Sequence, residues 1–250
     1  MRLSEADEAV LRENARDDLA LLARLHHSEL DKQALDDLRT ADFASLFALL
    51  PEDDAATQAC SVVDRGWKVM DDGDEARLLD ELAADFAATY LTYQHRVSPT
   101  ESVWLDDDNL ERQEPMIKVR QWYARFGAAA PDWRKTPDDH IALQLAFLSH
   151  IMTLRDETGA YAASLEGAAR FLDEHLLRWI DDFAAAAASR CDTPFYAGLA
   201  MFTRAWIRAF REGLTRVTGL EEPPEEEKPE TTPAPEAAEA PFVPGTGPAV

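Results

Sequence analysis

The sequence predicts an all-α fold. Apolar residues recur at three- and four-residue spacing through most of the chain, as they do on the buried face of a helix. No stretch alternates β-branched and polar residues between turn residues, as a half-buried strand would. Hydrophobic residues make up 46% of the 250 positions, which is enough to fill a sizeable core. We therefore expect one compact helical domain over residues 1–220.

The N-terminal part of the chain predicts one long helix followed by shorter ones. Ser4 with Asp7 resembles a capping box, and leucines then keep helical spacing up to the His26-His27 pair. Since imidazolium near a helix C-terminus favours the helix dipole, these two histidines are expected at the surface. Shorter helices are expected at residues 34–38, 43–49 and 51–70.

The middle of the chain predicts a helix, a loop and another helix. From Asp74, acids in the first turn and an apolar stripe that includes Phe86 and Tyr90 indicate a core-facing helix. Proline, serines and a run of acids then predict a long connection over residues 95–109, and long loops in compact domains are often functional. Helical spacing returns over residues 110–126.

Thr136 opens the next predicted helix. Its hydroxyl, Pro137 at the first helical position and Asp139 three residues further on form a capping pattern. The charge-free stretch 141–154 is shorter than the roughly 20 residues that cross a bilayer, so we expect a buried helix there. Two further helices are expected over residues 171–189 and 193–210, the second of which begins with another threonine-proline pair.

After Leu220 the composition changes abruptly. Residues 221–250 hold eight of the fourteen prolines together with many glutamates. Such a segment cannot bury enough apolar surface to offset the entropy of ordering. We expect a disordered acidic tail.

Charge and cysteine content narrow the possible partners. The formal net charge of −23 repels phosphate backbones and anionic membranes, so we expect neither nucleic-acid binding nor membrane insertion. Cys60 and Cys191 are far apart and lack C-x-x-C spacing, which indicates neither a disulfide framework nor a four-ligand zinc site. The N-terminus is acidic without an apolar h-region, and the sequence has no Arg-Arg pair, so we expect a cytoplasmic protein.

Catalytic motifs are missing from the sequence. None of the six histidines has glutamate three positions before it, which excludes the paired Glu-x-x-His motifs of a carboxylate-bridged di-metal site. There is no G-x-S-x-G, G-x-x-x-x-G-K-[ST] or G-x-G-x-x-G motif, so neither an activated serine nor a standard nucleotide cradle is indicated. We expect a protein that is not an enzyme and that holds no metal.

Two features keep a binding role open. Asp138 and Asp139 beside His140 form a potential site, but acids in a first helical turn also stabilise a helix by about 0.3 to 1 kcal/mol. Imidazolium at a helix N-terminus opposes the dipole, so helix formation alone does not explain His140. Trp104 either anchors its loop to the core or grips a peptide. Local physics favours capping for the first feature and leaves the second undecided.

A set of short motifs follows one another along the chain in a definite order. They are the aromatic pair Phe86 and Tyr90, P-T-E-S-V-W at Pro99–Trp104, M-I-K-V-R-Q-W-Y-A-R-F-G at Met116–Gly127, P-D-D-H-I-A-L-Q-L-A-F-L from Pro137, and F-L-D-E-H-L-L-R-W at Phe171–Trp179. This ordered set resembles the TorD/DmsD/NarJ family of cytoplasmic chaperones dedicated to molybdoenzymes of the dimethyl sulfoxide reductase superfamily. The resemblance covers roughly residues 10–210.

The resemblance implies a chaperone that recognises the twin-arginine leader of an apo catalytic subunit. It implies that export is delayed until the molybdopterin guanine dinucleotide cofactor is inserted. Such a leader joins a basic segment to an apolar one, which suits an acidic receptor with apolar residues. The residues expected to bind the client are Phe86, Tyr90, Pro99, Glu101, Ser102, Trp104, Pro137, Asp139 and His140.

Two other functions compete with this one. The first is a weak GTP-binding protein, in which Asp139 and His140 would hold a magnesium-phosphate group. The second is a helical adaptor or regulator unrelated to molybdenum. We expect no stably bound cofactor, only transient contact with the molybdenum cofactor or GTP, and a monomer or homodimer.

Overall fold

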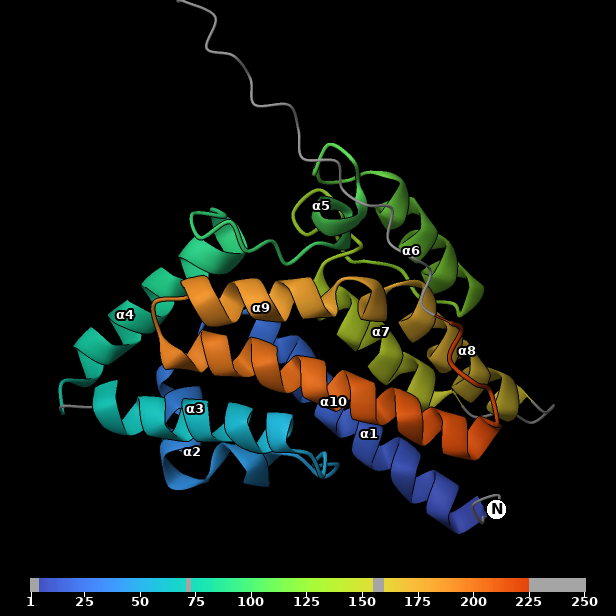
Figure 1. Cartoon of the computed structure of the whole chain (residues 1–250), viewed down its shortest axis with the longest axis horizontal. Coiled ribbons are helices and arrows are strands. Elements are labelled where there is room, and N and C mark those ends of the chain that lie inside the picture. The colour runs from blue at the N-terminus through green and yellow to red at the C-terminus, as the bar shows by residue number, and fades with distance from the viewer. Residues whose placement is uncertain (1–4, 71–72, 155–159, 225–250) are drawn as a thin grey trace, which may run out of the picture.

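The computed structural model describes residues 5–70, 73–154 and 160–224. Its helices pack in several directions around one core (Figure 1). The α-helices are α1 (Glu5–His27), α2 (Lys32–Thr40), α3 (Asp54–Met70), α4 (Glu75–Phe86), α5 (Glu101–Leu105), α6 (Glu114–Arg125), α7 (Ile141–Thr153), α8 (Ala160–Glu174), α9 (Ile180–Arg190) and α10 (Pro194–Thr218). A 3-10 turn η1 (Phe43–Leu46), a π-helical turn η2 (Ala87–Leu91) and a 3-10 turn η3 (Leu176–Arg178) complete the order. The described residues contain no β-strand, so the all-α prediction is confirmed.

Helix α10 forms the centre of the packing. It lies against α3, α8 and α9, while α1 packs along α7. Gly198 permits the close approach of α3, because a Cβ atom there would lie 2.5 Å from Cγ2 of Val63. The helix ends at Gly219, whose φ of 74° is the left-handed conformation that glycine adopts without strain.

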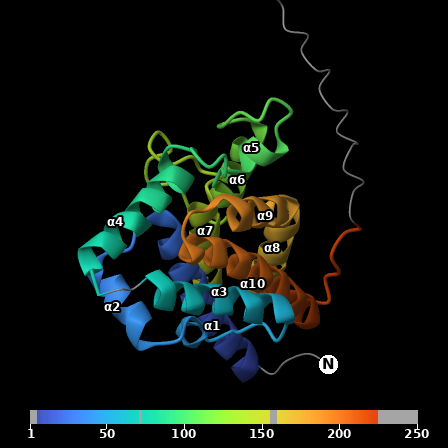
Figure 2. The ribbon, with the colours of Figure 1, turned by 60° about the vertical axis from the view of Figure 1, so that its left-hand side comes forward.

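Helices α5 and α6 lie at one end of the molecule. Figure 2 shows this end opposite the N-terminus of α1. Pro115 occupies the first turn of α6, where its missing N–H group leaves no hydrogen bond unmade. The prediction of a loop over residues 95–109 is wrong in part, because residues 101–105 form α5.

Several predicted boundaries hold and others do not. The long first helix and the buried helix after residue 140 are confirmed. The expected single helix over residues 171–189 is broken between α8 and α9, where the buried His175 turns toward Glu101 and leaves the helical conformation. The surface position expected for His26 is wrong, because its side chain is fully buried. The capping role of Ser4 lies outside the described residues.

The described helices include none that is long and apolar enough to cross a membrane. The predicted disordered tail, residues 221–250, falls mostly on residues 225–250, which lie outside the described part of the chain.

Candidate functional site

The two segments that carry the most specific motifs lie side by side. Thr100 and His140 form an isolated antiparallel bridge. The amide of Glu101 donates to the carbonyl of Asp139 at 3.1 Å, and the amide of Ile141 donates to the carbonyl of Pro99 at 2.7 Å. We call the segments Pro99–Trp104 and Pro137–Ile141 together the motif junction.

Asp139 fixes the first turn of α5. Its Oδ2 accepts hydrogen bonds from the amide of Ser102 at 2.8 Å and from the hydroxyl of Ser102 at 2.5 Å. Burial raises the pKa of Asp139 to about 6, although the bonds from Ser102 oppose the shift and the charge of Glu101 adds to it. The other oxygen, Oδ1, is buried and has no hydrogen-bond partner among the described residues.

Glu101 connects the junction to α7 and α8. Its Oε1 lies 2.8 Å from Nδ1 of His175, and its Oε2 accepts a hydrogen bond from Nε2 of Gln144 at 2.8 Å. Oε1 of Gln144 and Nε2 of His175 are buried without a partner in the described part of the chain. A buried polar group that lacks a hydrogen bond costs free energy. A displacement of α5 that broke the bonds of Glu101 would therefore be unfavourable, and the network constrains the position of α5.

Helix α6 reaches the same place through Asp138. The hydroxyl of Tyr123 donates to the carbonyl of Asp138 at 2.7 Å, and Arg120 pairs with the Asp138 carboxylate at 2.8 Å. The motifs on α6 and α8 therefore meet the junction through Asp138 and Glu101, although they are far from it in sequence.

His140 is the N-cap of α7. Its Nδ1 accepts a hydrogen bond from the amide of Ala142 at 3.1 Å, and burial lowers its pKa to about 3, with a smaller contribution from the charge of His27. The neutral imidazole thus avoids the unfavourable charge at a helix N-terminus. The predicted start at Thr136 is wrong, since the helix begins at Ile141. Residues 138–139 form a turn in which the amide of His140 donates to the carbonyl of Pro137 at 3.0 Å, and His140 lies in the bridge.

Phe86 and Tyr90 lead into the junction from the core. Their rings stack at 4.8 Å, and the Tyr90 ring lies 6.3 Å from that of His140. The Tyr90 hydroxyl is 2.7 Å from Nδ1 of His26, whose Nε2 is 2.8 Å from the Thr203 hydroxyl. Burial lowers the pKa of His26 to about 3. Sequence reasoning missed this histidine, although it follows Leu19 and Leu22 at helical spacing on the buried face of α1.

Trp104 anchors the junction from its outer side. The half-buried indole donates through Nε1 to the carbonyl of Ser98 at 2.8 Å, which supports the anchoring interpretation. Beyond it, Asp106 Oδ2 accepts the amides of Asp108 and Leu110 and so shapes the loop that follows α5. Asp107, Asp108 and Leu110 are exposed there, with 53% of Leu110 accessible. The loop therefore offers carboxylates beside an apolar side chain.

The structure brings the predicted site residues together but leaves few of them accessible. Eight of the nine are buried, and Trp104 alone among them is partly exposed. Their side chains mainly bond and pack against one another and their neighbours. In the described conformation the junction is an internal framework, and the accessible groups beside it include Arg120, which pairs with Asp138, and the loop of residues 106–111.

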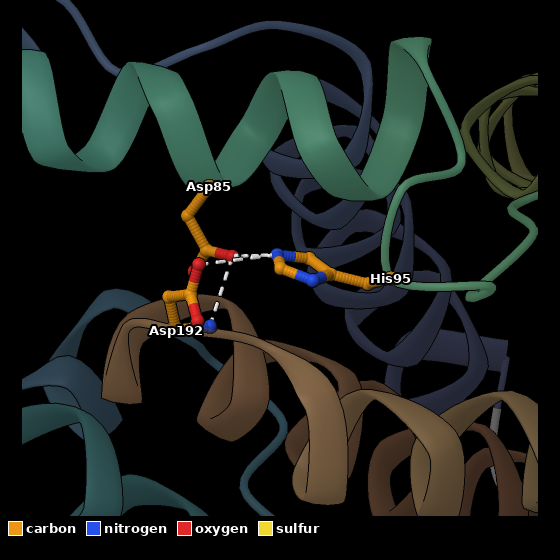
Figure 3. Close-up of side chains that lie close together, drawn as sticks. All are labelled: Asp85, His95 and Asp192. Atoms are coloured by element: carbon orange, nitrogen blue, oxygen red, sulfur yellow. Dashed lines mark hydrogen bonds and ion pairs between the residues drawn. The ribbon is translucent and has the colours of Figure 1, made fainter.

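A separate group of side chains has the composition of a metal site. Asp85, His95 and Asp192 form the single cluster of potential ligands found among the described residues (Figure 3). None of the three is at the motif junction. No sequence pattern indicated this group, because its members come from three different segments.

Comparison with known proteins agrees with the ordered motifs. Residues 52–185, just over half of the chain, match the family described as "Nitrate reductase delta subunit". "Chaperone protein TorD" of Vibrio vulnificus is 29% identical over 180 residues, which cover 70% of this chain and 82% of that protein. The proteins of the same name from Shewanella amazonensis and Escherichia coli are each 28% identical, over 75% and 72% of this chain and 86% of their own lengths. These relatives are named as chaperones and not as enzymes. The chain belongs to the TorD/NarJ family of molybdoenzyme-specific chaperones.

Proposed function

We propose that this chaperone binds the apo catalytic subunit of a molybdoenzyme of the dimethyl sulfoxide reductase superfamily through its twin-arginine leader. Binding takes place in the cytoplasm, before export, and keeps the subunit open for insertion of the molybdenum cofactor. Family membership supports the general role in molybdoenzyme maturation. The convergence of the family motifs on one junction is the observation that carries the more specific proposal.

The proposal assigns different roles to buried and exposed residues. Asp139, Ser102 and Glu101 hold α5 in place through the bonds described above. The loop after α5 then presents the carboxylates of Asp107 and Asp108 beside Leu110. Arginine guanidinium groups form strong charge-assisted hydrogen bonds with carboxylates, and an apolar side chain favours the hydrophobic segment of a leader. The family motif residues thus position the surface, and their neighbours contact the client.

Binding of a leader peptide to the full chain tests this assignment. A fluorescent peptide with a twin-arginine segment followed by an apolar segment should bind measurably by anisotropy. The variant Asp107→Asn/Asp108→Asn should bind it about tenfold more weakly, because two charged contacts are lost. Leu110→Ser should weaken binding without changing its salt dependence.

Matched variants elsewhere on the surface provide the control. Asp37→Asn/Asp80→Asn removes the same charge from exposed positions on α2 and α4, and Val10→Ser removes an exposed apolar side chain from α1. These should leave the affinity within about twofold, since long-range effects of exposed charges are screened. Equal losses in the two charge variants would mean that net charge alone attracts the peptide, and the proposed surface would be wrong.

The cofactor is expected to reach the client without a stable complex with the chaperone. The sequence has no phosphate-binding loop, so GTP with magnesium should give no heat in calorimetry at high protein concentration. We propose only transient contact with the molybdenum cofactor while the client is bound, by a chaperone that is a monomer or a homodimer.

A further inference from the structure

Three segments that are distant in sequence bring potential metal ligands together at one point. Asp85 lies on α4, His95 lies in the connection after η2, and Asp192 lies in the turn between α9 and α10 (Figure 3). Nε2 of His95 is 3.1 Å from Oδ1 of Asp85 and 3.5 Å from Oδ2 of Asp192. One ligand atom from each residue lies within 4.8 Å of the other two.

These separations fit coordination of one cation. Zinc bonds to imidazole nitrogen and carboxylate oxygen are about 2.0 to 2.2 Å long, so two ligands of a tetrahedral ion lie about 3.3 Å apart. The two measured distances from His95 are close to this value. The Asp192 side chain is 78% exposed, so it can rotate toward an ion without disturbing the packing. The arrangement therefore needs little adjustment to hold a metal.

The Asp85 carboxylate is oriented in the way that metal ligands usually are. It is buried, and its Oδ2 accepts hydrogen bonds from the amide of Thr193 at 2.8 Å and from the hydroxyl of Thr193 at 2.5 Å. The amide of Asp192 donates to Oδ1 at 3.1 Å. Such outer hydrogen bonds fix the direction of a ligand and are typical of metal sites. Oδ1 is also hydrogen-bonded to Nε2 of His95 at 3.1 Å, and a cation bound between these two atoms would take the place of the shared proton.

We propose that Asp85, His95 and Asp192 bind one divalent transition-metal cation, for which Zn²⁺ is the best match. An imidazole nitrogen with two carboxylate oxygens suits zinc, whereas Mg²⁺ is usually held by oxygen and water alone. Neutral His95 contributes Nε2, and the two carboxylates neutralise the charge of the ion. Exposure of Asp192 leaves a coordination position for water. The ion ties α4, the connection that leads to α5 and the turn before α10 to one another.

Calorimetric titration of Zn²⁺ alone into the EDTA-treated full chain tests the proposal. We expect one saturable site, and an increase in Tm of about 5 °C or more at a Zn²⁺ concentration of about 100 times Kd. His95→Gln and Asp192→Asn should each weaken this site at least tenfold, since each removes a ligand. Asp85 is left unchanged because its bonds to Thr193 support the fold.

Two control variants separate a built site from general attraction of cations to an acidic protein. His27→Gln and Asp37→Asn remove an exposed histidine and an exposed acid that lie outside the cluster. Both should keep the wild-type affinity. The visible absorption of bound Co²⁺ should also change in His95→Gln and not in His27→Gln, because nitrogen coordination affects that spectrum.

Several results would overturn the proposal. An absence of saturable binding would do so. An affinity for Zn²⁺ that is unchanged in both His95→Gln and Asp192→Asn would also do so. Weak binding at several positions, reduced equally by Asp192→Asn and Asp37→Asn, would identify an adventitious ion only. The metal titration uses Zn²⁺ alone without a leader peptide, so either proposal can fail without the other.

Discussion

Asp139 provides a pH test of the motif junction. Its carboxyl group is fully buried, and burial raises its pKa to about 6 from the ordinary value of 3.8. A carboxyl whose pKa is higher in the folded state binds its proton more tightly there, so ionisation destabilises the fold. The destabilisation is fully present above the folded pKa of about 6 and is removed as the pH falls toward 3.8. Acidification within this window therefore stabilises the protein through Asp139.

The size of the effect follows from the two pKa values. Their separation of about 2 units, at about 1.4 kcal/mol per unit, corresponds to about 3 kcal/mol over the whole window. Between about pH 7 and about pH 5, the stabilisation gained is about 1 kcal/mol. Asp139→Asn keeps an oxygen that can accept the bonds from Ser102 but cannot ionise. The free energy of unfolding of this variant should lack that gain.

Urea unfolding followed by circular dichroism measures the difference. Wild type and Asp139→Asn are compared at about pH 7 and about pH 5, so that the other titrating groups cancel between the two proteins. Asp80→Asn, at an exposed position of α4, should keep the pH dependence of the wild type. An equal pH dependence in Asp139→Asn and wild type would refute the account of Asp139 as a buried carboxyl with a raised pKa.

Two further predictions concern packing and charge. Gly198→Ala should lower the free energy of unfolding by about 1 to 3 kcal/mol, because its Cβ would meet Val63 Cγ2 at 2.5 Å. Gly213→Ala, on the same helix but with open space around it, should instead add about 0.5 to 1 kcal/mol, and urea unfolding that moved both variants in one direction would contradict this. The net charge of −23 makes the carboxylates of the folded protein repel one another. Salt screens this repulsion, since the Debye length falls from about 10 Å in about 0.1 M NaCl to about 3 Å in about 1 M NaCl. The Tm should therefore be higher at the higher salt concentration. A Tm that did not rise would show that self-repulsion contributes little to stability.

Local patterns predicted the helices whose burial follows a simple spacing. The apolar stripe from Asp74 and the charge-free stretch after residue 140 form α4 and α7. Helices with apolar residues at these positions are stabilised by burying that surface in the core. Thr193 followed by Pro194 marked the start of α10. In each case the local preference and the tertiary packing agree.

Local patterns failed where tertiary hydrogen bonds decide the conformation. The sequence around Thr136 has the pattern of a helix start, but Asp138 and Asp139 form a turn instead, and the bridge to Thr100 holds His140 just before the helix begins at Ile141. His175 interrupts an otherwise continuous helical pattern because it reaches Glu101, which lies 74 residues earlier in the chain. No property of either segment alone contains this information.

The resemblance to a family predicted which residues form the site, whereas the structure is needed to interpret their contacts. Ser102 and Asp139 are 37 positions apart in the chain and are joined by two hydrogen bonds. These bonds constrain both the residue type and the position of each partner. A contact with a leader peptide imposes a weaker requirement, because any accessible carboxylate and any apolar surface would serve. A recognisable motif is therefore a more natural consequence of the internal framework than of the contacting surface. By the same reasoning, the exposed residues Asp107, Asp108 and Leu110, which we propose as the contact surface, are expected to carry no recognisable pattern.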